Sequence, residues 1–265
     1  ADSLIISDPG IFSIVKQEGI KTPVSISTQA NTTNLAAVNF WASLGANRVI
    51  MAREVRQEDL IEIMKHAECE VETFIHGAIC ISMSGRCLIS SYMTGKDANN
   101  GECTHPCRWN YSLMEEKRDG EYFPVYEDER GTYLYNSKDL CLLDRIGELV
   151  KMGSASGKIE GRMKSIMYVS IVTGVYRQAI DLAKKNADNY KVLPEWRHLL
   201  ESVSNRGYIE GFYGGEYDAN AINRETSGYS RSAAFLGVAL KDSLNDELEI
   251  TCRAKFAPNE EITIL

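Results

Sequence analysis

Short apolar runs alternate with amphipathic stretches along the first 185 residues of the chain. Six apolar runs predict strands, at Ser3–Asp8, Val24–Gln29, Arg48–Ala52, Val71–His76, Tyr133–Asn136 and Gly157–Glu160. Apolar positions three and four residues apart predict the intervening helices, at Ile11–Glu18, Asn34–Leu44, Gln57–His66, Leu142–Met152 and Ser165–Lys185. This order predicts an α/β fold with a parallel sheet.

The length of each strand–helix unit, about 20 to 25 residues, suits a (βα) barrel of the TIM type. Each predicted strand also ends in polar residues, and these are Asp8, Gln29, Asn31, Arg53, Glu54, His76, Lys138, Asp139, Cys141, Lys158, Glu160 and Arg162. In such barrels the active site lies at the carboxyl ends of the strands. We therefore expect these side chains to share a site, although polar residues also begin ordinary loops.

The pattern changes after Lys185 to a short predicted helix at Trp196–Val203 and a glycine- and aromatic-rich, loop-like run at 207–215. Alternating residues then predict three β-strands, at Ala233–Leu240, Glu247–Phe256 and Glu260–Leu265. A domain boundary is expected near Tyr229.

Composition narrows the class of protein. Hydrophobic residues make up 44% of the chain and charged residues 25%, which are ordinary globular values. No apolar run is long enough to predict a membrane span, and no secretory leader is recognisable, so we expect a cytoplasmic protein. A net charge of −8 argues against non-specific nucleic-acid binding by the whole surface, while a local basic patch stays open.

Five of the seven cysteines lie close together, among glycines that bend the chain: Cys80, Cys87, Cys103, Cys107 and Cys141. Loops of this kind can aim several sulfurs at one point, as an iron–sulfur cluster requires. Zinc is an alternative, since Cys103-x3-Cys107 has a suitable spacing, although Cys80-x6-Cys87 is loose for it. Disulfides would need an oxidising compartment, and buried inert thiols are the remaining alternative.

The stretch ETFIHGAICISMSGRCLISSYMTGKDANNGECTHPCRW, together with ISDPG, STQANTTN, AREV, NSKDLC and KIEGRMKS, resembles the collagenase-like peptidase family U-32. Within that family it is most similar to the prephenate-dependent tRNA uridine hydroxylases. In those relatives four cysteines hold a 4Fe-4S cluster, and the resemblance implies that Cys80, Cys87, Cys103 and Cys141 do so here. Cys107 competes with Cys103 for its place. The resemblance favours iron–sulfur over zinc.

The resemblance also has consequences for the domains. Relatives carry roughly two further βα units upstream, so the barrel is expected to lack its first strands here. The expected organisation is a partial barrel over residues 1–228 with an inserted cysteine-rich loop at 77–131, followed by the start of a small β-barrel domain over residues 229–265. An upstream segment or a partner subunit would then complete the barrel.

Cations at a strand end and a helix start favour an anionic substrate. By resemblance this anion is prephenate, a dicarboxylate that serves as hydroxyl donor, and its expected binding residues are Arg53, Lys158, Glu160 and Arg162. Glu72 and His76 lie four apart on a predicted strand, so we expect them on one face as an acid–base or orienting pair. A satisfied core histidine is the plain alternative.

Basic residues interleaved with aromatic ones are typical of RNA-binding surfaces. The residues expected to bind tRNA are Arg108, Trp109, Lys184, Lys185 and Arg197, of which the first two are candidates for receiving a flipped base. The plain alternative is a solvated helix face with core aromatics.

The expected function is therefore iron–sulfur-dependent formation of 5-hydroxyuridine at the wobble position of tRNA, with prephenate as donor. Two alternatives stay open. A peptidase is one, although the chain has no H-E-x-x-H or G-x-S-x-G motif, and Cys80 with His76 matches no known dyad. A non-catalytic, metal-stabilised scaffold that binds RNA or a partner subunit is the other.

Overall fold

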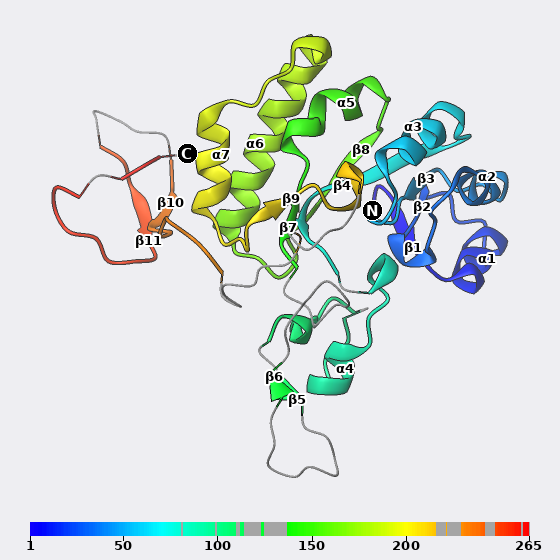
Figure 1. Cartoon of the computed structure of the whole chain (residues 1–265), viewed down its shortest axis with the longest axis horizontal. Helices are drawn as coiled ribbons and strands as arrows, with labels where there is room; N and C mark the ends of the chain where they lie inside the picture. The colour runs from blue at the N-terminus through cyan, green and yellow to red at the C-terminus, as the bar shows by residue number, and fades with distance from the viewer. Residues whose placement is uncertain are drawn as a thin grey trace.

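The computed structural model describes residues 1–80, 82–98, 100–109, 112–113, 123–124, 137–215, 221, 229–241, 247–260 and 262–264. Within these residues seven strands form one sheet (Figure 1). They are β1 (Leu4–Ile6), β2 (Val24–Ile26), β3 (Arg48–Ile50), β4 (Glu70–Ala78), β7 (Asp139–Cys141), β8 (Ser156–Glu160) and β9 (Tyr208–Ile209). The strand order is β1-β2-β3-β4-β7-β9, with β8 also paired to β4. The fold is mixed α/β, and the described strands leave the sheet open.

Helices cover both ends of this sheet. They are α1 (Pro9–Gln17), α2 (Leu35–Ser43), α3 (Gln57–His66), α4 (Ile89–Thr94), α5 (Ile146–Lys151), α6 (Ile166–Lys185) and α7 (Pro194–Ser202). Figure 1 shows α1–α3 beside β1–β3 and α5–α7 beside β7 and β9, while α4 lies apart with the cysteine-rich region. None of the described helices combines the length and the apolar character that crossing a bilayer requires.

The sequence explains where the main helices begin. The carboxylate of Asp8 accepts a hydrogen bond from the backbone N–H of Ile11 at the start of α1. Asn34 caps α2 in the same way, and Ser165 caps α6 through the N–H of Tyr168. Each cap satisfies a backbone donor that the helix leaves unpaired at its first turn.

Strand β4 is the longest strand and the centre of the sheet. Its residues Glu70–Glu72 pair with β3, Glu72–Gly77 pair in parallel with β8, and His76–Ala78 pair antiparallel with β7. The register against β8 shifts between Phe74 and His76, where two positions of β4 oppose one of β8, so β4 contains a β-bulge.

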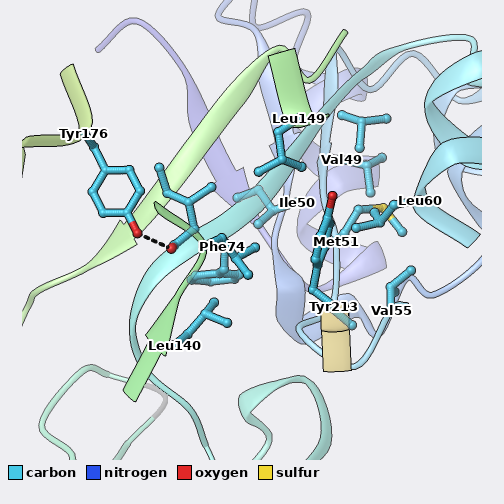
Figure 2. Packing of buried hydrophobic residues seen from close by; sticks show 14 of the residues in the cluster. Val49, Ile50, Met51, Val55, Leu60, Phe74, Leu140, Leu149, Tyr176 and Tyr213 are labelled. Atoms are coloured by element: carbon cyan, nitrogen blue, oxygen red, sulfur yellow. Dashed lines mark hydrogen bonds between the residues drawn. The ribbon is translucent and has the colours of Figure 1, made fainter. Parts of the chain in front are cut away.

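Apolar side chains from successive elements meet in the core. Figure 2 shows Val49 and Ile50 of β3 packed with Leu60 of α3 and Leu149 of α5. It also shows the hydroxyl of Tyr176 in α6 donating a hydrogen bond, which is 2.8 Å long and ends on the carbonyl of Ile75. This bond ties the long helix α6 to the strand at the position of the bulge.

The sequence-based strands at Ser3–Asp8, Val24–Gln29, Arg48–Ala52, Val71–His76 and Gly157–Glu160 are confirmed as β1, β2, β3, β4 and β8. The strand predicted at Tyr133–Asn136 lies outside the described residues. The prediction of a parallel sheet is wrong at β7. The chain leaves β4 at its carboxyl end and returns from that same end after the cysteine-rich region, so β7 enters the sheet antiparallel to β4.

Two small hairpin-like ladders lie outside the main sheet. Strands β5 (Ser112–Leu113) and β6 (Phe123–Pro124) pair antiparallel, as do β10 (Gly237–Ala239) and β11 (Ile250–Cys252). The second pair confirms two of the three strands predicted near the end of the chain. The third, at 260–265, has no strand in its described residues, 260 and 262–264. The proposed domain boundary stays a prediction.

Gly77 offers a direct test of how closely β4 and β8 approach. A Cβ at this position would lie 2.4 Å from the carbonyl oxygen of Glu160, and Gly77 has a φ of 116°. We expect Gly77→Ala to destabilise the fold by roughly 1–3 kcal/mol or more in urea unfolding. Gly174→Ala on α6, where nothing lies within 4 Å, should instead stabilise it by roughly 0.5–1 kcal/mol. Equal effects of both variants would contradict the described strand packing.

Candidate metal and substrate site

The carboxyl ends of β2, β3, β4 and β8 border one cavity of about 300 Å³. Gln29 follows β2, Arg53 follows β3, Cys80 follows β4, and Glu160 ends β8. The cavity therefore brings together predicted strand-end residues of β2, β3 and β8, whereas His76, the residue predicted for β4, does not line it. The remaining wall comes from the cysteine segment, which we define as residues 80–109.

Four thiols of this segment line the cavity: Cys80, Cys87, Cys103 and Cys107. Burial raises the pKa of the Cys80 thiol to about 11, and the neighbouring Cys87 and Cys107 act in the same direction. The backbone N–H of Ser82 opposes this by donating to the Cys80 sulfur. A second such donor is the N–H of His105, 3.4 Å from the sulfur of Cys103. Donors of this kind stabilise thiolates and are typical of thiolate-bound metal centres.

Cys141 lies elsewhere. It sits on β7 opposite His76, with its sulfur 3.6 Å from the hydroxyl of Tyr176. It borders a second cavity of about 160 Å³ rather than the first. The structure thus brings three of the four predicted ligands together with Cys107, and Cys141 as the fourth ligand stays a prediction. Among the described residues no three His, Cys, Asp or Glu side chains are placed to hold a single metal ion.

Four cations border the first cavity: Arg53, Lys158, Arg162 and Lys164. The guanidinium of Arg53 lies 3.6 Å from the centroid of the Phe74 ring and 3.9 Å from the carboxylate of Glu160. Lys158 lies 3.4 Å from the carboxylate of Glu72, beneath the cavity. Positive charge therefore exceeds negative charge on this wall, which favours an anionic ligand.

Lys164, one of the cations that the KIEGRMKS stretch places near a strand end and a helix start, also lines the cavity. Its side chain is only 6% exposed, and its ammonium donates to the carbonyl of Ser204 at 2.9 Å. The ammonium also lies 3.6 Å from the carboxylate of Asp139, which is fully buried. The sequence shows this lysine at a helix start, but its partner lies 25 positions away on β7, so spacing alone could not reveal the pair.

Glu72 and His76 do not share a face, contrary to expectation. Glu72 points to Arg48 and Lys158, at 3.0 and 3.4 Å, whereas His76 packs against tyrosines of α6 and β9. The bulge explains the difference, because one extra residue between the two reverses the alternation of a strand. Any catalytic role for either residue stays a prediction.

His76 is fully buried. The hydroxyl of Tyr176 donates to the carbonyl of Ile75 and lies 3.2 Å from Nδ1 of His76. Nε2 of His76 has no hydrogen-bond partner in the described part of the chain. Burial lowers the pKa of His76 to about 3, so the ring is neutral at physiological pH.

Comparison with known proteins assigns the chain to a family. The model of peptidase family U32 matches residues 1–223. The chain belongs to peptidase family U32.

Relatives of the chain within the U32 family carry two kinds of name. The chain is 35% identical to tRNA hydroxylation protein P of Escherichia coli, over 100% of this chain and 67% of that protein. It is 38% identical to tRNA hydroxylation protein P1 of Bacillus subtilis, over 80% of this chain and 50% of that protein. A collagenase of Porphyromonas gingivalis is 28% identical to the chain, over 90% of this chain and 58% of that protein. The chain therefore spans between half and about two thirds of the length of these relatives. No solved structure matches it.

The residues predicted to bind RNA in this U32 chain do not form one surface. Trp109 is exposed and follows Cys107, which lines the first cavity. The side chain of Arg108 is not among those that the structure describes. Arg197 pairs with Asp144 at 2.5 Å at the second cavity. Lys184 and Lys185 end the 20-residue helix α6, which begins at the first cavity, so they lie roughly 30 Å from it.

The depressed pKa of His76 predicts a pH dependence of stability. The folded state binds this proton only near pH 3, while the unfolded state binds it near pH 6.5, so acid favours the unfolded state. Stability should fall as pH drops from about 6.5 toward 3, with a loss of roughly 1.4 kcal/mol per unit of pKa shift. Urea unfolding at several pH values measures this.

His76→Asn keeps a hydrogen-bonding group near the position of Nδ1 and should flatten the dependence of the unfolding free energy on pH. The exposed His198→Asn is the matched control and should leave the slope unchanged. A wild-type slope that survives in His76→Asn would show that another group is responsible.

Proposed function

We propose that this chain carries the metal- and donor-binding part of a tRNA hydroxylase that forms 5-hydroxyuridine at the wobble position. The observation that carries the proposal is a single cavity where four thiols lie beside four cations, at the carboxyl ends of parallel strands. The names of the Escherichia coli and Bacillus subtilis relatives support the reaction class. A tRNA substrate would place the reaction in the cytoplasm.

The proposed cofactor is a 4Fe-4S cluster held by Cys80, Cys87 and Cys103, with Cys141 or Cys107 as the fourth ligand. A single zinc ion about 2.3 Å from each sulfur needs its ligands within about 4 Å of one another. A four-iron cluster would bind each thiolate through a different iron, so its ligands can lie further apart than those of a single zinc ion. When bound, the cluster would supply one-electron chemistry at the cavity wall.

The proposed donor is prephenate, whose two carboxylates suit the cations of the same cavity. The guanidinium of Arg53 lies 3.6 Å from the centroid of the Phe74 ring, a contact that restricts its orientation, and it would supply positive charge to a bound carboxylate. Lys158 and the buried Lys164 would contribute further charge, and Glu160 would orient Arg53. Because these side chains are already held by protein contacts, binding costs little side-chain entropy.

The tRNA would approach over the cysteine segment. Trp109 is exposed next to the thiols and offers a surface on which an extruded uracil can stack. At the other end of the sheet, β1 ends the strand order and Ile5 on it is 59% exposed. We propose that upstream strands, in the same protein or in a partner, pair with β1 and complete a TIM-type barrel.

A peptidase is the second candidate, favoured by the name of the Porphyromonas gingivalis relative. The Cys80 and His76 pair proposed for it is not supported by the described geometry. Cys80 lines the first cavity, whereas His76 borders neither cavity and faces tyrosines.

Iron and sulfide analysis after anaerobic reconstitution tests the cofactor. We expect about four irons and four sulfides per chain with broad visible absorption, and loss of both in Cys80→Ser, Cys87→Ser and Cys103→Ser. The exposed Cys252→Ser is the matched control and should keep its iron. Comparing Cys107→Ser with Cys141→Ser identifies the fourth ligand. Stoichiometric zinc without iron would reject the cluster and favour the scaffold.

Mass analysis of tRNA nucleosides tests the reaction. A strain that lacks its own tRNA hydroxylation proteins should regain 5-hydroxyuridine when it expresses the protein, and Arg53→Gln should reduce this by roughly tenfold or more. Arg177→Gln, an exposed residue of α6, should have no effect. Unchanged nucleosides together with casein or gelatin cleavage would establish the peptidase instead.

A further inference from the structure

The cysteine segment has little regular structure of its own. Between Cys80 and Trp109 the described part contains the one-turn elements η2 (Met83–Gly85) and η3 (Pro106–Arg108) and the short helix α4. No long helix or strand therefore sets the spacing between its thiols. The described contacts between this segment and the rest of the chain include one near Cys80 and Cys87 and another near Cys103.

The first contact is made by Ser84, which lies between Cys80 and Cys87. Ser84 is 1% exposed, its N–H donates to the carboxylate of Glu54 at 2.9 Å, and its hydroxyl donates to the side-chain oxygen of Asn31 at 2.6 Å. Ser84 and Asn31 both have a positive φ, 54° and 59°. Asparagine adopts left-handed backbone readily, but serine does so rarely, so we infer that the surrounding contacts impose it on Ser84.

The second contact is made by Arg162, two residues after β8. Its Nη2 donates to the carbonyl of Asn100 at 2.6 Å. Its guanidinium lies against Gly101, where a Cβ would fall 1.7 Å from the guanidinium carbon. Gly101 has a φ of 77° and precedes Cys103 by two residues. The backbone N–H of Arg162 donates to the carboxylate of Glu160 at 3.1 Å. This hydrogen bond fixes the turn from which the Arg162 side chain reaches Gly101.

We propose that Ser84 and Arg162 are positioning residues for the metal-binding thiols. Ser84 sets Cys80 and Cys87 relative to β2 and β3, and Arg162 sets Cys103 relative to β8. The inference rests on the proposed function for the identity of the metal, but the placement of the thiols is a property of the chain itself. Arg162 then serves the cysteine segment rather than acting as a free clamp for the donor.

Alkylation of single cysteines in the metal-free chain, followed by mass spectrometry, tests this placement without any activity assay. Arg162→Ala and Gly101→Ala should each speed alkylation of Cys103 by roughly fivefold, the effect of losing about one hydrogen bond. Gly95→Ala is the matched control, because Gly95 also has a positive φ in the same segment but has no atom within 4 Å. Ser84→Ala should speed alkylation of Cys80 and Cys87 and leave Cys103 unchanged.

Arg162→Lys separates positioning from substrate binding. Lysine keeps the charge but lacks the planar guanidinium that fits against Gly101. If Arg162 positions Cys103, this variant should show fast alkylation of Cys103 and low iron content after reconstitution. Normal alkylation and iron content in Arg162→Lys and Arg162→Ala, with an unchanged circular dichroism spectrum, would overturn the proposal. If the wild-type chain takes up no iron, the proposed function fails, and the alkylation rates still decide the positioning roles.

Discussion

The pairing of β4 with three strands at once is the constraint on which the rest of the structure depends. Its first residues pair with β3, its middle residues pair with β8, and its last residues pair with β7. The bulge between Phe74 and His76 shifts the alternation of side chains by one residue, so that His76 does not face the same side as Glu72 and Phe74. Glu72 and Phe74 therefore support the cavity through Lys158 and Arg53, while His76 joins the tyrosines beneath α6. The same strand ends at Ala78, two residues before Cys80, so its register also fixes where the cysteine segment begins.

Cations at the cavity would offset the negative charge of the proposed thiolate ligands and of the proposed anionic donor. The chain as a whole has a net charge of −8, yet Arg53, Lys158, Arg162 and Lys164 gather at the strand ends. Ionised thiolates and carboxylates would repel one another in a partly desolvated cavity unless cations lie close by. Glu160 and Asp139 each lie within 4 Å of one of these cations, Arg53 and Lys164 respectively. The cavity thus combines four thiols with a field that favours anions.

Much of the fold could be predicted from the sequence because its signals are local. The apolar spacing of α1, α3 and α6 predicted their helices directly, and short apolar runs predicted five of the strands. The bulge could not be predicted, since Phe74, Ile75 and His76 are all buried and read as one continuous apolar run. The antiparallel entry of β7 depends on the path of a long insertion, which local patterns do not encode.

The candidate site was predictable in its residue types but not in its partners. Cysteines among glycines indicated thiols that converge, and the structure brings Cys80, Cys87 and Cys103 to one cavity. The grouping of Cys107 with them, and the position of Cys141 beside Tyr176, follow from pairings between distant segments. The same holds for the pair of Lys164 and Asp139. Contacts of this kind depend on tertiary packing, and one sequence contains no local signal for them.

The central claim is that thiols of the cysteine segment converge on one inorganic centre at the end of β4. An anomalous-scattering map at the iron edge, from crystals of the chain reconstituted without oxygen, tests this most directly. The account predicts one compact iron peak in the cavity bordered by Cys80, Cys87 and Cys103. Iron at scattered surface positions, or no iron near these three sulfurs, would contradict it.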